Sequence, residues 1–474
     1  MKKNGHVIFS VMLVIVLLFS ISGCSADKGS AAVTDSAKSE TVSKTETEES
    51  SSEKSSSKPN SVQQASSERS APSNSSKPTE NSSAVYTPKY INLMKNITPA
   101  TVPGRVADDA FISGQMNFAL ELFKKTVPIA ENPNPLVSPL SVQLAFAMLA
   151  NGAEGKTKSE MEELLGGGVK IEQLNEYLYT YVKNLYTDES NKLNIANSIW
   201  INDIYSKDIE NSFLQTNADY YGAAAYKAPF DQKTLDYINS WVKKKTDGTI
   251  EKIFEHLDVT EVICLINTLL FEADWQNGYR EYGNNITFTS ISGEERTVKA
   301  MQGQESKFIS DGSAKGFIKD YKGGKYSFAA LIPNEDVNIT DYINSLTAQG
   351  VFETLNNVNE CKVFTQMPMF NYDCEYNLVN ILTEMGMPSA FKTSANFTKI
   401  DKSDVLFVNV AVHKTHIEVN EKGTKVSAAT GIRMSKSLKE YDERVILDRP
   451  FVYMIIDNST KLPIFMGAVM DIGE

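Results

Sequence analysis

Histidine is scarce in this 474-residue chain, with four residues, of which His6 lies in an N-terminal apolar segment. A hydrolytic triad would need His256, His413 or His416 beside a Ser or Cys nucleophile, and no serine stands in a GxSxG turn. His413 and His416 are three positions apart in a predicted strand, so their side chains point to opposite faces and would not share a metal ion. The sequence therefore predicts no catalytic residue and no metal site.

A phosphate-binding loop is also missing. Gly155-Lys156-Thr157 resembles the end of such a loop, but Ala150 occupies the position of its first glycine. A predicted helix, rather than the required strand, precedes it. We therefore expect no nucleotide and no other cofactor.

Cysteine and positive charge are in short supply as well. The three cysteines beyond the N-terminal region, Cys264, Cys361 and Cys374, are odd in number and irregularly spaced, so a disulfide framework is not expected, although one pair stays open. Cys264 lies in an apolar run and is predicted to be a buried thiol. The formal net charge of −12 argues against a nucleic acid as partner.

Residues 25–85 contain no aromatic residue and no Leu, Ile or Met. Such a segment buries too little apolar surface to offset its ordering entropy, so we predict a disordered tether over residues 25–90. Before it, basic Lys2 and Lys3 and the apolar run Val7–Ile21 indicate a secretory signal over residues 1–24. The remaining residues, 91–474, contain no Pro/Ser-rich break and are predicted to form one large domain.

The signal ends in Ile21-Ser22-Gly23-Cys24, which resembles the lipobox of bacterial lipoproteins. The resemblance implies that Cys24 is lipidated and holds the protein at the bacterial cell surface. The alternative is an ordinary cleaved signal with an incidental cysteine. Both interpretations place the protein outside the cytoplasm.

Regular elements are indicated along the domain. Helices are predicted over Asn117–Thr126, Ser141–Ala150 and Thr157–Leu165, the last ending at three glycines. The unalternating apolar run Cys264–Phe271 indicates a central strand covered on both faces. These patterns predict a mixed α and β domain.

The segment from Glu421 to Leu438 has the alternation of a strand but lies between two predicted strands as a long loop. One face would carry Thr424, Val426, Ala428, Thr430, Ile432 and Met434, and the other Lys425, Ser427, Ala429, Gly431, Arg433 and Ser435. Small side chains dominate the first half, which would let the segment enter between packed strands. The alternation therefore indicates a loop segment that can become an additional strand of a sheet, rather than a simple linker.

This region resembles the serpin family: HKTHIEVNEKGTKVSAATG followed by DRPFVYMIIDNSTKLPIFMGAV is similar to the reactive-centre loop and C-terminal strands of serpins. Further serpin-like motifs are Asn134–Val142 with Gly152–Thr157, and Cys264–Phe271 with Trp275. The resemblance covers about residues 100–474. It implies an α+β serpin fold with three β-sheets, about eight to nine helices and an exposed reactive-centre loop at about 421–448.

The resemblance also implies site residues. The hinge of the loop would comprise Glu421, Gly423, Thr424, Val426, Ala428, Ala429 and Thr430, where Val426 and the adjacent Ser427 depart from the usual alanines. A polar cluster beneath the sheet, the shutter, would comprise Ser138, Ser141, Asn267 and His413. These residues would govern how readily the sheet opens.

The implied function is suicide inhibition of serine proteases by a monomer that inserts its cleaved loop. Counting from Glu421 places the reactive bond at Ser437-Leu438, which leaves Lys436-Ser437 and Leu438-Lys439 as alternatives. The first alternative suits a trypsin-like enzyme, and the second a chymotrypsin- or subtilisin-like one. A non-inhibitory serpin, acting as a surface binding or structural module, is the competing function.

Overall fold

The computed structural model describes residues 90–129, 133–185, 190–279, 284–402, 406–424 and 440–473, which belong to one compact unit, Ser83–Glu474. Several predicted features lie outside the described residues: the signal with Cys24, the tether up to residue 89, and the loop segment 425–439. That segment contains Val426, Ala428, Ala429, Thr430 and every proposed reactive-bond residue, namely Lys436, Ser437, Leu438 and Lys439.

Several helices of the described residues begin at a polar side chain that caps them. Asp108, Ser138 and Asp231 each accept a hydrogen bond from a backbone N–H of the helix that follows. The helices are α1 (Asp109–Thr126), α2 (Pro139–Ala150), α3 (Gly155–Gly166), α4 (Ile171–Asn184), α5 (Asn211–Tyr221), α6 (Gln232–Lys245), α7 (Ile339–Ser345), α8 (Ala348–Asn356) and α9 (Leu378–Glu384).

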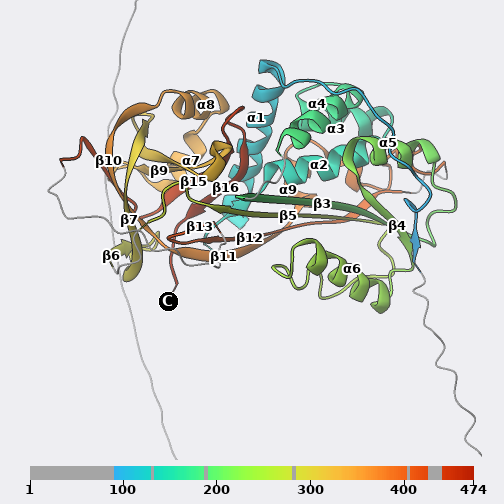
Figure 1. Cartoon of the computed structure of the whole chain (residues 1–474). Coiled ribbons are helices and arrows are strands. Elements are labelled where there is room, and N and C mark those ends of the chain that lie inside the picture. Colours follow the sequence, from blue (N-terminus) through green and yellow to red (C-terminus); the bar gives the residue numbers. More distant parts are fainter. Residues whose placement is uncertain are drawn as a thin grey trace, which may run out of the picture. The chain divides into compact units, whose positions relative to one another are not determined.

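The central sheet has the strand order β1-β4-β3-β5-β13-β12-β11. Its strands are β1 (Ile91–Asn92), β4 (Ala224–Ala228), β3 (Asn191–Asn202), β5 (Ile263–Asp274), β13 (Gly423–Thr424), β12 (Val408–Val419) and β11 (Phe370–Asn377). Helix α6 lies on one side of this sheet and α2, α3 and α4 lie on the other (Figure 1). The apolar run predicted as a central strand forms β5, where Cys264 packs in the cluster under α6 and Leu265 packs in the main core.

The remaining strands form one hydrogen-bonded network in the order β14-β10-β7-β8-β9-β15-β16-β2, with β6 paired to β7. Their bounds are β2 (Leu136–Val137), β6 (Asn284–Thr289), β7 (Glu295–Ser310), β8 (Ala314–Asp320), β9 (Tyr326–Pro333), β10 (Asn359–Pro368), β14 (Glu443–Ile446), β15 (Phe451–Asp457) and β16 (Pro463–Val469). Strand β7 pairs with β10 over Ala300–Phe308 and continues into pairing with β8 over Lys307–Ser310. Two of the three expected sheets are therefore joined through β7 in the described residues.

Candidate functional site at the opening of the central sheet

The central sheet divides between β5 and β12. These two strands pair in parallel from Ile263 to Thr268 on β5 and from Val408 to Lys414 on β12. Beyond that point, β13 lies between them and runs antiparallel to both. Within the described residues, positions 269–272 of β5 and 415–418 of β12 are not paired with each other. The start of the predicted hinge thus already occupies the end of an opening in the sheet.

A tight turn at Asn420 leads the chain from β12 into β13. The Asn420 N–H donates to the Gly423 carbonyl at 3.0 Å, and its Oδ1 accepts from the N–H groups of Lys422 and Gly423 at 3.0 and 3.3 Å. Gly423 is pressed against β5, because a Cβ at this position would lie 2.0 Å from the carbonyl oxygen of Ala273. The close approach therefore requires glycine.

Two residues after β5 hold this turn. The Trp275 backbone N–H donates to the Lys422 carbonyl at 2.8 Å, and its indole Nε1–H donates to the Asn420 carbonyl at 2.9 Å. The Tyr279 N–H donates to the Glu421 carbonyl at 2.8 Å. Three consecutive carbonyls of the turn are thus bound by donors from the segment 275–279.

Thr424 ends the described part of the hinge and is 2% exposed. Its Oγ1 is hydrogen-bonded to the Tyr321 hydroxyl, with 2.7 Å between the oxygens. The Tyr321 ring stacks on Trp275 with 4.4 Å between ring centroids. The first inward-facing hinge residue is therefore fixed by both polar and aromatic contacts.

The four predicted shutter residues lie together where β5 and β12 still pair. The Ser138 N–H donates to His413 Nε2 at 3.0 Å, and His413 Nδ1 lies 3.1 Å from Asn267 Oδ1. Asn267 Nδ2 donates to the Ser141 carbonyl, and Ser138 Oγ caps α2 by accepting from the Ser141 N–H. Burial lowers the pKa of His413 to about 3, so its ring is neutral at physiological pH, with the proton on Nδ1.

The structure also separates the two histidines of β12. His413 is buried on the core side, whereas His416 bonds the Asp373 carboxylate of β11 at 2.8 Å between Nδ1 and Oδ1. Among the described residues, no group of three or more His, Cys, Asp or Glu side chains is arranged to hold a metal ion. Cys264, Cys361 and Cys374 are free thiols, so the disulfide left open by the sequence is not formed.

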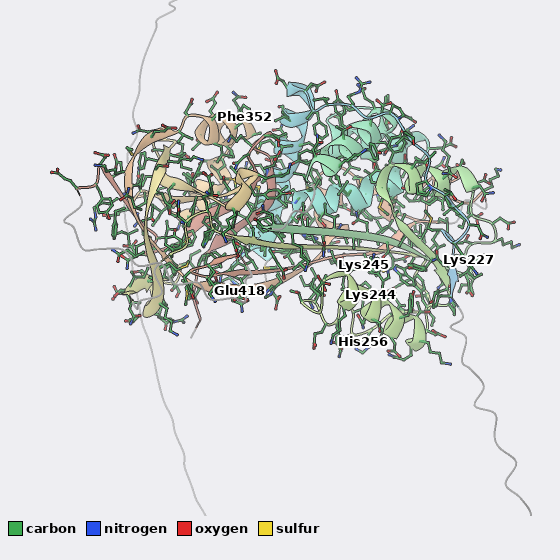
Figure 2. All side chains as sticks on the ribbon, viewed as in Figure 1. Lys227, Lys244, Lys245, His256, Phe352 and Glu418 are labelled. Carbon is green, nitrogen blue, oxygen red and sulfur yellow. The ribbon has the colours of Figure 1, made fainter. Side chains whose placement is uncertain are left out.

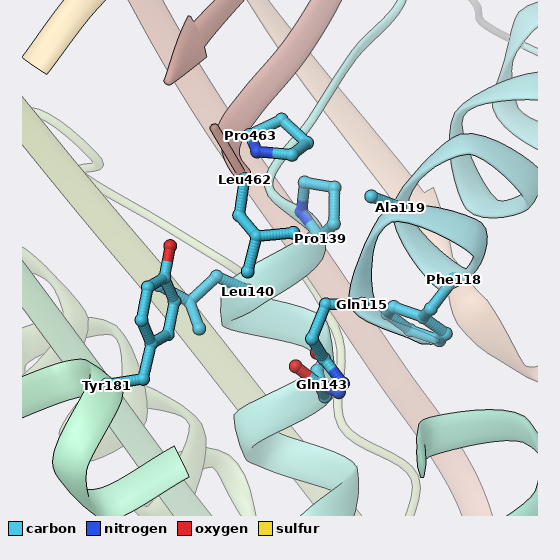
Figure 3. A pocket seen from close by; sticks show the side chains of 9 residues that line it. All are labelled: Gln115, Phe118, Ala119, Pro139, Leu140, Gln143, Tyr181, Leu462 and Pro463. Carbon is cyan, nitrogen blue, oxygen red and sulfur yellow. The ribbon is translucent and has the colours of Figure 1, made fainter. Parts of the chain in front are cut away.

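Pockets elsewhere in the described residues differ in size. The pocket in Figure 3, lined by α1, α2, Tyr181 and the start of β16, has a volume of about 10 Å³, which is room for about one water molecule. A groove of about 310 Å³ lies between α1 and α8, with Phe352 on its α8 side (Figure 2). Among the described helices, none combines the length and apolar character that crossing a membrane requires.

The sequence interpretation missed the residues that hold the hinge: Asn420, Trp275, Tyr279 and Tyr321. For Trp275, the sequence indicates only membership of a serpin-like motif. The pair of turn formers Asn420 and Gly423 is the local signal that could have located the turn. The contacts of Trp275, Tyr279 and Tyr321 join positions more than a hundred residues apart and have no local signal.

Comparison with known proteins agrees with this geometry. A family model described as serpin (serine protease inhibitor) matches residues 113–472. Human neuroserpin is 28% identical over 400 residues, which is 80% of this chain and 94% of neuroserpin. The native-state crystal structure of the thermophilic serpin tengpin has a TM-score of 0.77 at 39% identity and covers 81% of this chain and 100% of its own. Tengpin in its latent state has a TM-score of 0.69 at 38% identity and covers 78% and 100%.

Proposed function

Because the chain belongs to the serpin family, whose members are mostly protease inhibitors, we propose that it traps serine proteases as a suicide substrate. The serine hydroxyl of the protease attacks the carbonyl carbon of Ser437, and the amine of Leu438 leaves with the C-terminal segment. The cleaved loop then inserts into the central sheet before water can hydrolyse the ester. The observation that best supports this proposal is the position of β13, which already lies between β5 and β12.

The register of β13 defines where an inserting strand would pair. Gly423 is opposite Asp274, and Thr424 is opposite both Ala273 and Val419. Continuing this antiparallel register brings Val426 opposite Phe271 and Ile417, Ala428 opposite Leu269 and Thr415, and Thr430 opposite Asn267 and His413. All six of these sheet residues are buried, so the apolar face of the loop would enter the core.

The same register gives the outward face an electrostatic match. Lys425 would lie opposite Glu272 of β5 and Glu418 of β12. Glu418 lies near the β13 end of β12, away from α6 with its Lys244 and Lys245 (Figure 2). Opposite charges on neighbouring strands stabilise pairing, so the first residue to enter the opening would gain favourable contacts on both sides.

Insertion must break contacts before it makes them. Thr430 can pair with both neighbours only after the hydrogen bond between Asn267 and His413 separates, together with the pairing of β5 and β12 around it. In return, about ten inserted residues make ladder hydrogen bonds at roughly 1 kcal/mol each and bury several apolar side chains at about 1.5–3 kcal/mol each. This gross gain, on the order of 15–20 kcal/mol before the cost of separating β5 from β12, is at least comparable to the stability of a typical domain.

The length of the opening is compatible with the proposed reactive bond. In the continued register, Met434 would pair with Ile263, the first residue of β5. Ser437 and Leu438 then follow just beyond the inserted strand, as do the alternatives Lys436 and Lys439. The protease would be carried to the far end of the sheet. The class of target protease, whether trypsin-, chymotrypsin- or subtilisin-like, depends on which of these bonds is cleaved.

We place this reaction outside the cytoplasm. A lipid on Cys24 and the tether would hold a monomeric inhibitor at the bacterial surface, where secreted proteases act. The alternative function is a non-inhibitory binding module, and the groove between α1 and α8 supports it. Its volume of about 310 Å³ lies at the lower end of the range of small-molecule sites.

The test is to incubate the purified protein with trypsin-, chymotrypsin-, elastase- and subtilisin-like proteases and analyse the products on denaturing gels. We expect a denaturant-stable complex with at least one protease, and mass spectrometry of the released peptide identifies the reactive bond. The same proteases with their nucleophilic serine replaced by alanine are the control and should give no covalent complex. Simple cleavage by every protease, with no gain in thermal stability of the cleaved protein, would exclude the inhibitory mechanism and favour the binding module.

A further inference from the structure

A buried ion pair lies directly beneath the segment that holds the hinge. Lys319 of β8 is 2% exposed, and its Nζ donates to Glu305 Oε1 of β7 at 2.6 Å and to the Asn277 carbonyl at 2.8 Å. Asn277 lies between Trp275 and Tyr279, the two residues that bind the turn carbonyls. The ammonium group is thus attached to the middle of the segment 275–279.

The same ammonium group also faces both aromatic rings of that segment. Lys319 Nζ lies 4.1 Å from the ring centroid of Tyr279 and 5.4 Å from that of Trp275, distances at which a cation is attracted to an aromatic face. Tyr321, which bonds Thr424, follows Lys319 in the chain and stacks on Trp275. One cation therefore contacts, directly or through a single ring, every residue that fixes the hinge.

A contribution to stability does not by itself explain why the Lys319–Glu305 ion pair is buried here. Burial raises the pKa of Glu305 and lowers that of Lys319, while their mutual attraction opposes both shifts. Asp320 and Lys307 also act on the pair from β8 and β7. Packed apolar residues of similar volume are often equally or more stabilising than a buried ion pair. An apolar residue in the place of Lys319 could not donate a hydrogen bond to the Asn277 carbonyl. It could also make no cation–π contact with the rings of Trp275 and Tyr279.

We propose that Lys319 is a positioning residue for loop insertion, which holds the segment 275–279 so that Gly423 and Thr424 stay within the sheet. Without the ammonium group, Trp275 and Tyr279 hold the turn less firmly and Thr424 leaves the opening more often. Insertion then starts later, and more acyl-enzyme is hydrolysed. The effect on trapping rests on the proposed inhibitory function, whereas the effect on the hinge does not.

The test compares Lys319→Met, the double variant Lys319→Met/Glu305→Leu and the control Lys307→Met. The double variant leaves no unpaired charge buried. The control removes another lysine–carboxylate side-chain pair of β7 and β8, Lys307 with Asp320 at 2.6 Å. Asp320 reaches the segment 275–279 through its backbone carbonyl, which accepts from the Gln276 N–H at 2.9 Å, and Lys307→Met leaves that backbone bond in place. Hydrogen exchange of the Trp275 and Tyr279 amides is measured by mass spectrometry without protease, and the number of inhibitor molecules consumed per trapped protease is measured with it.

We expect exchange at these two amides to be on the order of tenfold faster in both Lys319 variants and unchanged in the control. The inhibitor consumed per trapped protease should rise severalfold in the same two variants. If the double variant restores wild-type exchange and consumption, the pair is only structural and the proposal is wrong. If the wild-type protein traps no protease, the inhibitory function fails, and the exchange measurement still decides whether Lys319 positions the hinge.

Discussion

Replacing Thr424 by arginine tests loop insertion at the residue where it begins. Thr424 is buried between β5 and β12, opposite Ala273 and Val419, and its hydroxyl is bonded to Tyr321. A guanidinium group in this place would have to share a space lined by apolar side chains and the Tyr321 ring. It would therefore prevent β13 from staying in the sheet.

The magnitude follows from two contributions. Losing the hydrogen bond leaves the Tyr321 hydroxyl buried without a partner, which costs about 1–3 kcal/mol. Burying an unpaired guanidinium costs several kcal/mol more. A total above about 4 kcal/mol corresponds to roughly a thousandfold shift away from the inserted form.

The assay measures both outcomes of the reaction, covalent trapping of the protease and simple cleavage of the loop. We expect Thr424→Arg to be cleaved by the target protease at the wild-type rate, to form no denaturant-stable complex, and to show no rise in melting temperature after cleavage. Thr424→Ser is the matched control, because it keeps the hydroxyl that bonds Tyr321, and it should trap protease as the wild type does. Covalent trapping by Thr424→Arg at wild-type stoichiometry would refute the insertion argument.

Three further predictions concern residues around the sheet. Asn267→Ala removes the partner of His413 and of the Ser141 carbonyl and should lower the free energy of unfolding by about 2–4 kcal/mol in urea melts; an unchanged midpoint would contradict the shutter contacts. Burial raises the pKa of Glu261 to about 7 from an unfolded value of 4.5, so the folded protein loses stability as pH rises from 4.5 through 7. Glu261→Gln should therefore be equally stable at pH 4 and, after discounting for partial exposure, about 1–2 kcal/mol more stable than wild type at pH 8 in melts at both pH values. With residues 1–24 removed, partly exposed Cys361 should react first with a thiol reagent, whereas buried Cys264 and Cys374 should react only on unfolding, as peptide mapping would show.

Several elements could be predicted from the sequence because their signals are local. The apolar run Cys264–Phe271 indicated a strand covered on both faces, and it forms most of β5. The helix predicted over Ser141–Ala150 is α2, with Ser138 as its cap. The helix predicted from Asn117 begins earlier, at Asp109, because Asp108 caps it by accepting from the Phe111 N–H.

The site was predicted only in part. Resemblance located the four shutter residues, and the structure brings them together; their role in opening the sheet stays a prediction. The hinge prediction covers Glu421, Gly423 and Thr424 among the described residues. Trp275, Tyr279 and Tyr321 have no local signal, because each is joined to the hinge by contacts between distant parts of the chain. Asn420 is the exception, since its turn lies next to the hinge in the sequence.

The pattern of the loop, with its small side chains and an alternation that can form a strand, is encoded locally in the sequence. Both depend on neighbouring residues alone and are visible without a structure. In contrast, the start of this strand at Gly423, in register with Asp274, and the contact of Lys319 with the segment 275–279 arise from tertiary packing. Strand register and the burial of a charge depend on which distant surfaces meet, and no periodicity within a short segment specifies that meeting.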